Sequence, residues 1–161
     1  MAAAAASLQS ITAFGQEIEI QEIEIKGIRL GMTLAELKEK VGTFPIKNFT
    51  IAGVPSIHSR LMPEFYDDKL DNLFFFFKSD SFYQVHGAIM KKYPKLACEN
   101  STVTNRMGAS FTQVKCSLSD KLGTLRLNLF SSDIDTSVLS LTSDRLVKEH
   151  RDKAKANNND L

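Results

Sequence analysis

A predicted β-hairpin between the two cysteines constrains the fold of this chain more than any other feature. The segment 104–109 reads Thr-Asn-Arg-Met-Gly-Ala, which is typical of a hairpin with a three-residue loop at 106–108. In that class of loop a type I turn is followed by a left-handed residue, and Gly108 occupies this position. Asn105 then pairs with Ala109, and this pair sets the register of both strands.

Counted back from this turn, Cys98 lies directly opposite Cys116, at a separation compatible with a disulfide. The apolar residues of the two strands do not all fall on one face in this register. Val114 shares the face of the cysteines, whereas Val103 and Phe111 lie on the other face. Two buried, reduced thiols in a cytosolic protein are the alternative interpretation. Because disulfides persist in oxidising compartments, we predict a disulfide in a periplasmic or secreted protein.

The composition is that of one soluble domain. A chain of 161 residues suffices for a single core, and 43% hydrophobic with 24% charged residues is typical of a globular protein. The net charge of +1 gives no global field toward nucleic acid or an acidic membrane. No apolar stretch approaches the roughly 18 residues of a membrane span. We expect one domain over 16–156 and a disordered tail over 157–161.

The N-terminal segment differs from the rest of the chain. Residues 1–15 carry no charge, and Ala13 and Gly15 are small residues at the two positions that a signal peptidase reads. We interpret 1–15 as a signal-peptide remnant. The alternatives are an alanine-rich tail, or a start codon assigned too far downstream, which would clip a real signal. No cysteine lies near this boundary, so we expect no lipid anchor.

Two capped helices are predicted. Thr33 and Glu36 form a capping box, in which each side chain satisfies a backbone N–H at the helix start, and Gly42 is a natural stop. Ser81 opens a second capping box, and that helix continues to about Tyr93.

Alternating apolar and polar residues predict strands around these helices. Strand patterns occupy the second copy of a five-residue acidic repeat and six later segments: 21–25, 46–54, 56–66, 96–104, 109–118, 124–130 and 136–142. Charged residues from Asp144 onward favour a further helix. We therefore predict an α+β fold, with antiparallel sheet or sheets packed by the two capped helices, a C-terminal β-meander and a polar C-terminal helix.

The run Leu73–Phe77 is the most apolar part of the chain. Alternate residues of a strand face opposite sides, so both faces of this strand are aromatic. We expect a central strand that is covered on both sides. The alternative is an exposed aromatic face for a partner or a homodimer.

The sequence offers no recognisable catalytic or metal-binding pattern. His58, His86 and His150 are far apart, and none belongs to a ligand or catalytic spacing. His86 lies beside the apolar stripe of its helix, which favours a position at the edge of the core. The acidic groups 67–68 and Asp71 lack the ligand series of a calcium loop. We predict no enzymatic activity, no metal and no cofactor.

The segment 31–37, Gly-Met-Thr-Leu-Ala-Glu-Leu, with Gly42 closing the helix, resembles the opening motif of a bacterial envelope superfamily. That group contains the SmpA/OmlA lipoproteins and the β-lactamase inhibitory protein, and a looser echo recurs over 81–93. The segment 103–111 resembles small uncharacterised exported proteins of proteobacteria and their prophages. The resemblance implies antiparallel sheets packed by helices, in proteins that bind other proteins in the periplasm and catalyse nothing. The chain lacks the lipobox cysteine of the lipoproteins.

These observations predict an exported, non-catalytic protein-binding or inhibitor-like domain. Its partner is expected to be another protein, and its oligomeric state is open. Candidate contact residues are aromatic, cationic or exposed loop residues: His58, Arg60, Phe65, Tyr66, Arg106 and Met107. One alternative is a phage-encoded or immunity-type inhibitor of a host enzyme in the cytosol, with both cysteines reduced. Another is an enzyme whose pocket gathers His58 or His86 with the acidic groups at 67–71.

Overall fold

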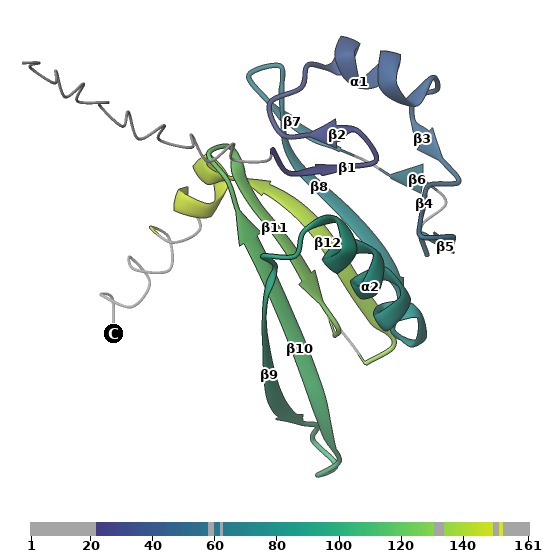
Figure 1. Cartoon of the computed structure of the whole chain (residues 1–161), viewed down its shortest axis with the longest axis vertical. Helices are drawn as coiled ribbons and strands as arrows, with labels where there is room; N and C mark the ends of the chain where they lie inside the picture. Colours follow the sequence, from purple (N-terminus) through teal and green to yellow (C-terminus); the bar gives the residue numbers. More distant parts are fainter. Residues whose placement is uncertain (1–21, 58–59, 62, 131–133, 150–151, 153–161) are drawn as a thin grey trace, which may run out of the picture.

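The computed structural model describes residues 22–57, 60–61, 63–130, 134–149 and 152. The expected signal remnant, the first copy of the acidic repeat and the expected tail lie outside these residues. The fold is α+β, and it is built on one six-stranded antiparallel sheet in the order β7-β8-β12-β11-β10-β9 (Figure 1). The strands of this sheet are β7 (Glu64–Tyr66), β8 (Lys69–Lys78), β9 (Ala97–Thr104), β10 (Ser110–Ser119), β11 (Gly123–Asn128) and β12 (Thr136–Ser143).

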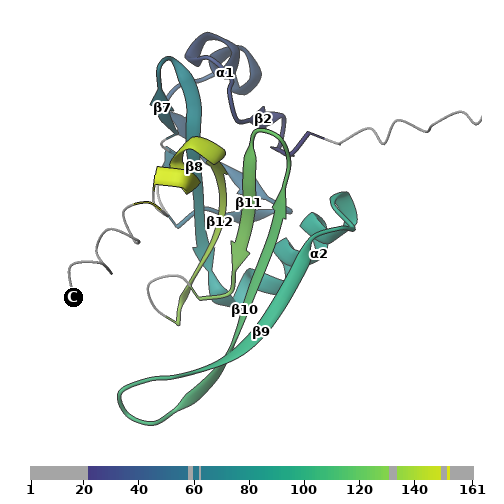
Figure 2. The ribbon, with the colours of Figure 1, turned by 90° about the vertical axis from the view of Figure 1, so that its left-hand side faces the viewer.

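The C-terminal half forms the predicted meander. Strands β9, β10, β11 and β12 pair in succession, and β12 then pairs with β8, so the last strand of the sequence lies next to the phenylalanine strand. Each strand falls within about two residues of its expected bounds, because period-two alternation and the turns between strands are local signals. Figure 2 shows that the β9–β10 hairpin extends well beyond the other strands.

Strand β8 lies second from the edge of the sheet, beside the short β7, so the expectation of a central strand is wrong. One side of β8 is fully covered. Phe75 and Phe77 are 0% exposed, and their rings stack with centroids 5.5 Å apart. On the other side Phe74 is 38% exposed and Phe76 is half-buried. The expectation of a strand covered on both faces is therefore wrong for the Phe74 side.

Helix α2 (Phe82–Lys92) covers the buried side of the sheet through Phe82, Val85 and Ile89. The helix is confirmed, but its predicted capping box is not formed. A 3-10 turn, η1 (Ser79–Ser81), leads directly into α2, so Ser81 has φ −93° and ψ 5° instead of the extended backbone of a capping residue.

The N-terminal part packs beside α2 on the same side of the sheet (Figure 1). It contains helix α1 and three short strand pairs: α1 (Leu34–Val41), β1 (Glu24–Ile25) with β2 (Ile28–Arg29), β3 (Ile46–Lys47) with β6 (Arg60–Leu61), and β4 (Thr50–Ile51) with β5 (Val54–Pro55).

The capping box of Thr33 and Glu36 is present, and hydrogen bonds from the Thr33 backbone and hydroxyl lower the pKa of Glu36. The Tyr93 hydroxyl joins the two parts, since it donates to the Glu24 carbonyl and accepts from the Glu24 amide, both at 2.8 Å.

A polar cluster closes the end of the sheet where β12 leads into a helical segment at 144–149. The carboxylate of Asp71 accepts hydrogen bonds from the Ser143 hydroxyl and the Arg145 guanidinium. The same guanidinium lies 3.8 Å from the ring centroid of Tyr66. Burial alone raises the pKa of Asp71, but the hydrogen bonds and charge of Arg145, with the Ser143 hydroxyl, outweigh it and leave the pKa lowered.

Two glycines offer a matched test of packing. A Cβ at Gly123 would overlap the Thr142 carbonyl oxygen and lie 2.5 Å from Leu30 Cδ1, whereas a Cβ at Gly87 in α2 meets nothing within 4 Å. We expect Gly123→Ala to lower the free energy of unfolding by about 1–3 kcal/mol through overpacking. Gly87→Ala should raise it by about 0.5–1 kcal/mol through helix propensity. Urea unfolding measures both, and equal effects of the two substitutions would contradict this packing.

The Asp71 cluster predicts a dependence of stability on pH. Because the pKa of Asp71 is lower in the folded chain, its stabilisation is fully present above the unfolded carboxyl pKa and is lost as pH falls through the folded value. We expect Asp71→Asn to lower the free energy of unfolding by about 1–3 kcal/mol at neutral pH. The difference from the unsubstituted chain should shrink at acidic pH in urea unfolding curves. A difference that stays constant down to low pH would exclude a role for the ionised carboxylate.

Candidate functional site

The side of the six-stranded sheet that faces away from α2 carries the residues with most functional potential. We call it the open face. Strand pairing arranges its side chains in two rows that cross five strands. The first row is Ala97, Ser117, Arg126, Ser140 and Phe74, and the second is Glu99, Lys115, Asn128, Val138 and Phe76.

The β8 end of the open face is aromatic. The rings of Phe74 and Phe76 stack with centroids 5.7 Å apart. Beside them on β12, Val138 and Ser140 are buried, so the two rings form the accessible apolar part of this end. An aromatic pair at the margin of a polar surface is a common anchor for a protein partner.

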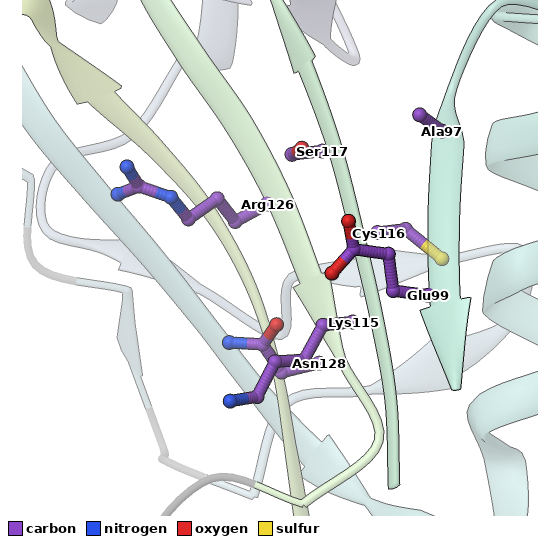
Figure 3. Close-up of a pocket in the computed structure, with 7 residues that line it drawn as sticks. All are labelled: Ala97, Glu99, Lys115, Cys116, Ser117, Arg126 and Asn128. Carbon is purple, nitrogen blue, oxygen red and sulfur yellow. The ribbon is translucent and has the colours of Figure 1, made fainter. Parts of the chain in front are cut away.

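The β9–β10 end of the open face is charged and hollowed. A hollow of about 290 Å³ is lined by residues of β9, β10 and β11: Ala97, Glu99, Lys115, Cys116, Ser117, Arg126 and Asn128 (Figure 3). Glu99 and Lys115 are exposed and directly opposite each other, and Arg126 is half-buried. Within the described part of the chain, these three side chains make no ion pair or hydrogen bond, so their charges are available to a partner.

Arg126 lies at the centre of the open face. Figure 3 shows its side chain extending from β11 toward β12, away from Glu99. Along the first row only Ser140 separates it from Phe74. A half-buried guanidinium two strands away from an exposed phenylalanine places a cationic and an aromatic side chain on one surface, and both types of side chain serve as anchors at protein interfaces.

A disulfide braces the hairpin that forms the other end of the open face. Cys98 and Cys116 are directly opposed and bonded, with Cα atoms 4.0 Å apart, which confirms both the predicted register and the predicted bond. Gly108 has φ +84°, as the three-residue loop requires. The Asn105 side-chain oxygen accepts hydrogen bonds from the amides of Met107 and Ala109 at 3.0 and 2.9 Å. The two strands of the hairpin are therefore joined by a covalent bond at the end away from the loop, and hydrogen bonds of Asn105 hold the loop itself.

Four of the six residues predicted for partner contact fall at two opposite edges of the six-stranded sheet. Arg106 and Met107 lie at the hairpin tip, where Met107 is 93% exposed. Tyr66 is 57% exposed on β7 beside Arg145, and Phe65 is half-buried against the core. Arg60 lies in strand β6, and His58 lies outside the described residues. The structure does not bring these two groups together.

The sequence patterns do not single out Arg126 or Phe74 as site residues. The signal for Phe74 was present in the alternative interpretation of the phenylalanine run as an exposed aromatic face. Arg126 interrupts an apolar strand as Leu125-Arg126-Leu127, and period-two alternation assigns it to the side away from the core. Strand alternation does not show which strands lie beside β11. Arg126 becomes a candidate for partner binding only because β12 and then β8 follow β11 in the sheet and place Phe74 in the same row.

No family model, curated protein or solved structure matches this chain. The likeness of the segment at 31–37 to a bacterial envelope superfamily therefore stays a prediction. None of the helices in the described ranges has the length and apolar character needed to cross a bilayer.

The disulfide makes a prediction about stability. We expect the double variant Cys98→Ala, Cys116→Ala to lose about 2–3 kcal/mol of unfolding free energy, as for a disulfide that closes a loop of this size. Urea unfolding with and without reductant measures the loss. The unsubstituted chain should lose a similar amount on reduction, whereas the double variant should not respond to reductant. A reductant effect that persists in the double variant would show that the cysteines are not its source.

Proposed function

We propose that this chain is a non-catalytic protein-binding domain that receives a partner protein on the open face of its sheet. The observation that carries the proposal is the alignment of Phe74 and Arg126 in one cross-strand row, with Lys115 and Glu99 in the next, where neither forms an ion pair with any residue that the structure describes. Apolar, cationic and anionic groups on one rigid surface are what a protein partner of mixed polarity needs.

The dimensions of the open face favour a protein over a small molecule. The hollow of about 290 Å³ is at the lower limit of small-molecule pockets, which span about 300–1,000 Å³. Each row extends across four strand spacings of about 4.8 Å, or roughly 19 Å in all. The hollow occupies only the β9, β10 and β11 part of the two rows, so a partner that covers both rows also contacts β12 and β8. The mixed charge also argues against nucleic acid, because Glu99 lies directly opposite Lys115.

Export to an oxidising compartment such as the periplasm is part of the proposal. The Cys98–Cys116 disulfide supports it, since disulfides persist where thiol reductants are scarce. The resemblance of the segment at 31–37 to envelope proteins points the same way. If the chain instead acts in the cytosol as a phage or immunity-type inhibitor, protein taken from intact cells without reductant will contain two free thiols.

The competing enzyme hypothesis has little support among the described residues. It needs His58 or His86 near the acidic groups at 67–71. His86 lies on α2 beside Cys98, whereas Asp71 is engaged by Arg145 at the far end of the sheet.

Site-directed variants test the open face. A photo-reactive amino acid at Ser117, which lies within the hollow, should crosslink the partner in intact cells, and the captured protein is then titrated against purified variants. We expect Phe74→Ser and Arg126→Ala each to weaken binding by about tenfold or more, as central anchors do.

Tyr83→Ser is the matched control, because Tyr83 is an aromatic residue that is 67% exposed on α2, across the sheet from the open face. It should leave the dissociation constant unchanged. The proposal fails if Tyr83→Ser weakens binding as much as Phe74→Ser, or if neither open-face variant has an effect.

A further inference from the structure

A side-chain cluster on the covered side of the sheet brings three soft ligands together. Among the described residues, the Nε2 of His86 and the Sγ atoms of Cys98 and Cys116 lie within 4.8 Å of one another. The His86 Nε2 lies 3.5 Å from the Cys98 Sγ. In the oxidised chain both sulfurs are bonded to each other, so neither can act as a thiolate ligand. Reduction of the disulfide gives two thiols next to the imidazole.

We propose that reduction of the disulfide converts Cys98, Cys116 and His86 into a binding site for Zn²⁺. Thiolate and imidazole are the ligands that Zn²⁺ prefers, and three protein ligands leave the fourth tetrahedral position to water or to a group of the partner. This proposal does not depend on the open face, which is on the other side of the sheet.

The distance between the imidazole and the nearer sulfur fits a tetrahedral zinc site. Zn–S bonds of about 2.3 Å and Zn–N bonds of about 2.0–2.1 Å, at a tetrahedral angle, separate the two ligand atoms by roughly 3.5 Å. The Nε2–Sγ distance of 3.5 Å in the structure equals this value. Cys116 occupies the position directly opposite Cys98, so its sulfur stays within reach of the same ion after the bond opens.

The imidazole is held in place by its neighbours on α2. Its ring stacks on Phe82 with centroids 5.7 Å apart and an interplanar angle of 17°, and it meets the edge of Tyr83 at 6.5 Å. Because Phe82 is 0% exposed, the ring rests on a fixed surface. The helix therefore supplies one ligand and the hairpin supplies two, and a bound ion would join these two layers of the fold.

The cluster is accessible from solvent through Cys98. This residue is exposed whereas Cys116 is 1% exposed, so an external dithiol attacks the sulfur of Cys98 and the Cys116 thiolate leaves. The second thiol of the dithiol then displaces Cys98 and closes a disulfide within the reductant. The protein gains two electrons and two protons, and the dithiol loses them. Zn²⁺ then displaces the two thiol protons to solvent and accepts the lone pair of Nε2.

Cobalt spectroscopy on the full chain tests the proposal, since Co²⁺ substitutes for Zn²⁺ and reports its geometry. After reduction without oxygen, we expect one Co²⁺ per chain to give the visible d–d bands of a tetrahedral site and a thiolate charge-transfer band. Addition of Zn²⁺ should remove both signals. The oxidised chain should show neither signal. If the oxidised chain gives the same cobalt bands before reduction, the proposal is wrong.

Variants identify the ligands. Cys98→Ser leaves one thiolate and should lower the intensity of the charge-transfer band by about half or more, and His86→Gln should shift the d–d bands and weaken binding by about tenfold or more. Lys91→Gln, an exposed change on the same helix, should do neither. Bands that His86→Gln leaves unchanged would overturn the three-ligand site. So would a reduced chain that loses its circular-dichroism spectrum and does not recover it with Zn²⁺.

Discussion

The apolar side of β8 is the surface on which the other parts of the fold assemble. Phe75 and Phe77 are wholly buried there, and each contributes about 1.5–3 kcal/mol through burial. Phe49 of the N-terminal part packs edge-on against Phe75 at 5.8 Å, and Phe82 starts α2 shortly after the strand ends. Because α2 and the N-terminal part pack on the same side, the core forms on one face of the sheet, and the opposite face can keep polar and aromatic groups accessible.

Much of this fold is predictable because its signals are local. The capping box at Thr33, the loop at Gly108 and the alternation in the four C-terminal strands each depend on a few neighbouring residues. The opposition of Cys98 and Cys116 follows from the loop alone. Prediction failed where distant elements decide the outcome. At Ser81 a 3-10 turn replaces the cap, and Ser79 of this turn is bound to the carbonyls of Leu129 and Asp135 from a distant part of the chain. At Phe74 nothing in the sequence tells which side of the strand the helix will cover.

The candidate site was less predictable than the fold for the same reason. Arg126 and Phe74 are far apart in sequence, and they share a surface only because β12 inserts between β8 and β11. His86 and Cys98 likewise meet through the packing of α2 against the hairpin. By contrast, the contact residues Tyr66 and Met107 were predicted from residue type and expected loop position, and they lie on opposite edges of the sheet.

The position of the disulfide also affects how the molecule can diversify. The covalent tie and the buried side chains of the hairpin lie near the sheet, whereas the tip at 105–109 is exposed and projects into solvent (Figure 2). Substitutions of the exposed tip residues Arg106 and Met107, which leave Asn105 and Gly108 in place, therefore leave the folding free energy of the domain nearly unaltered. The side chains at the two exposed tip positions can therefore change in size and charge while the disulfide and the core that support the hairpin stay the same.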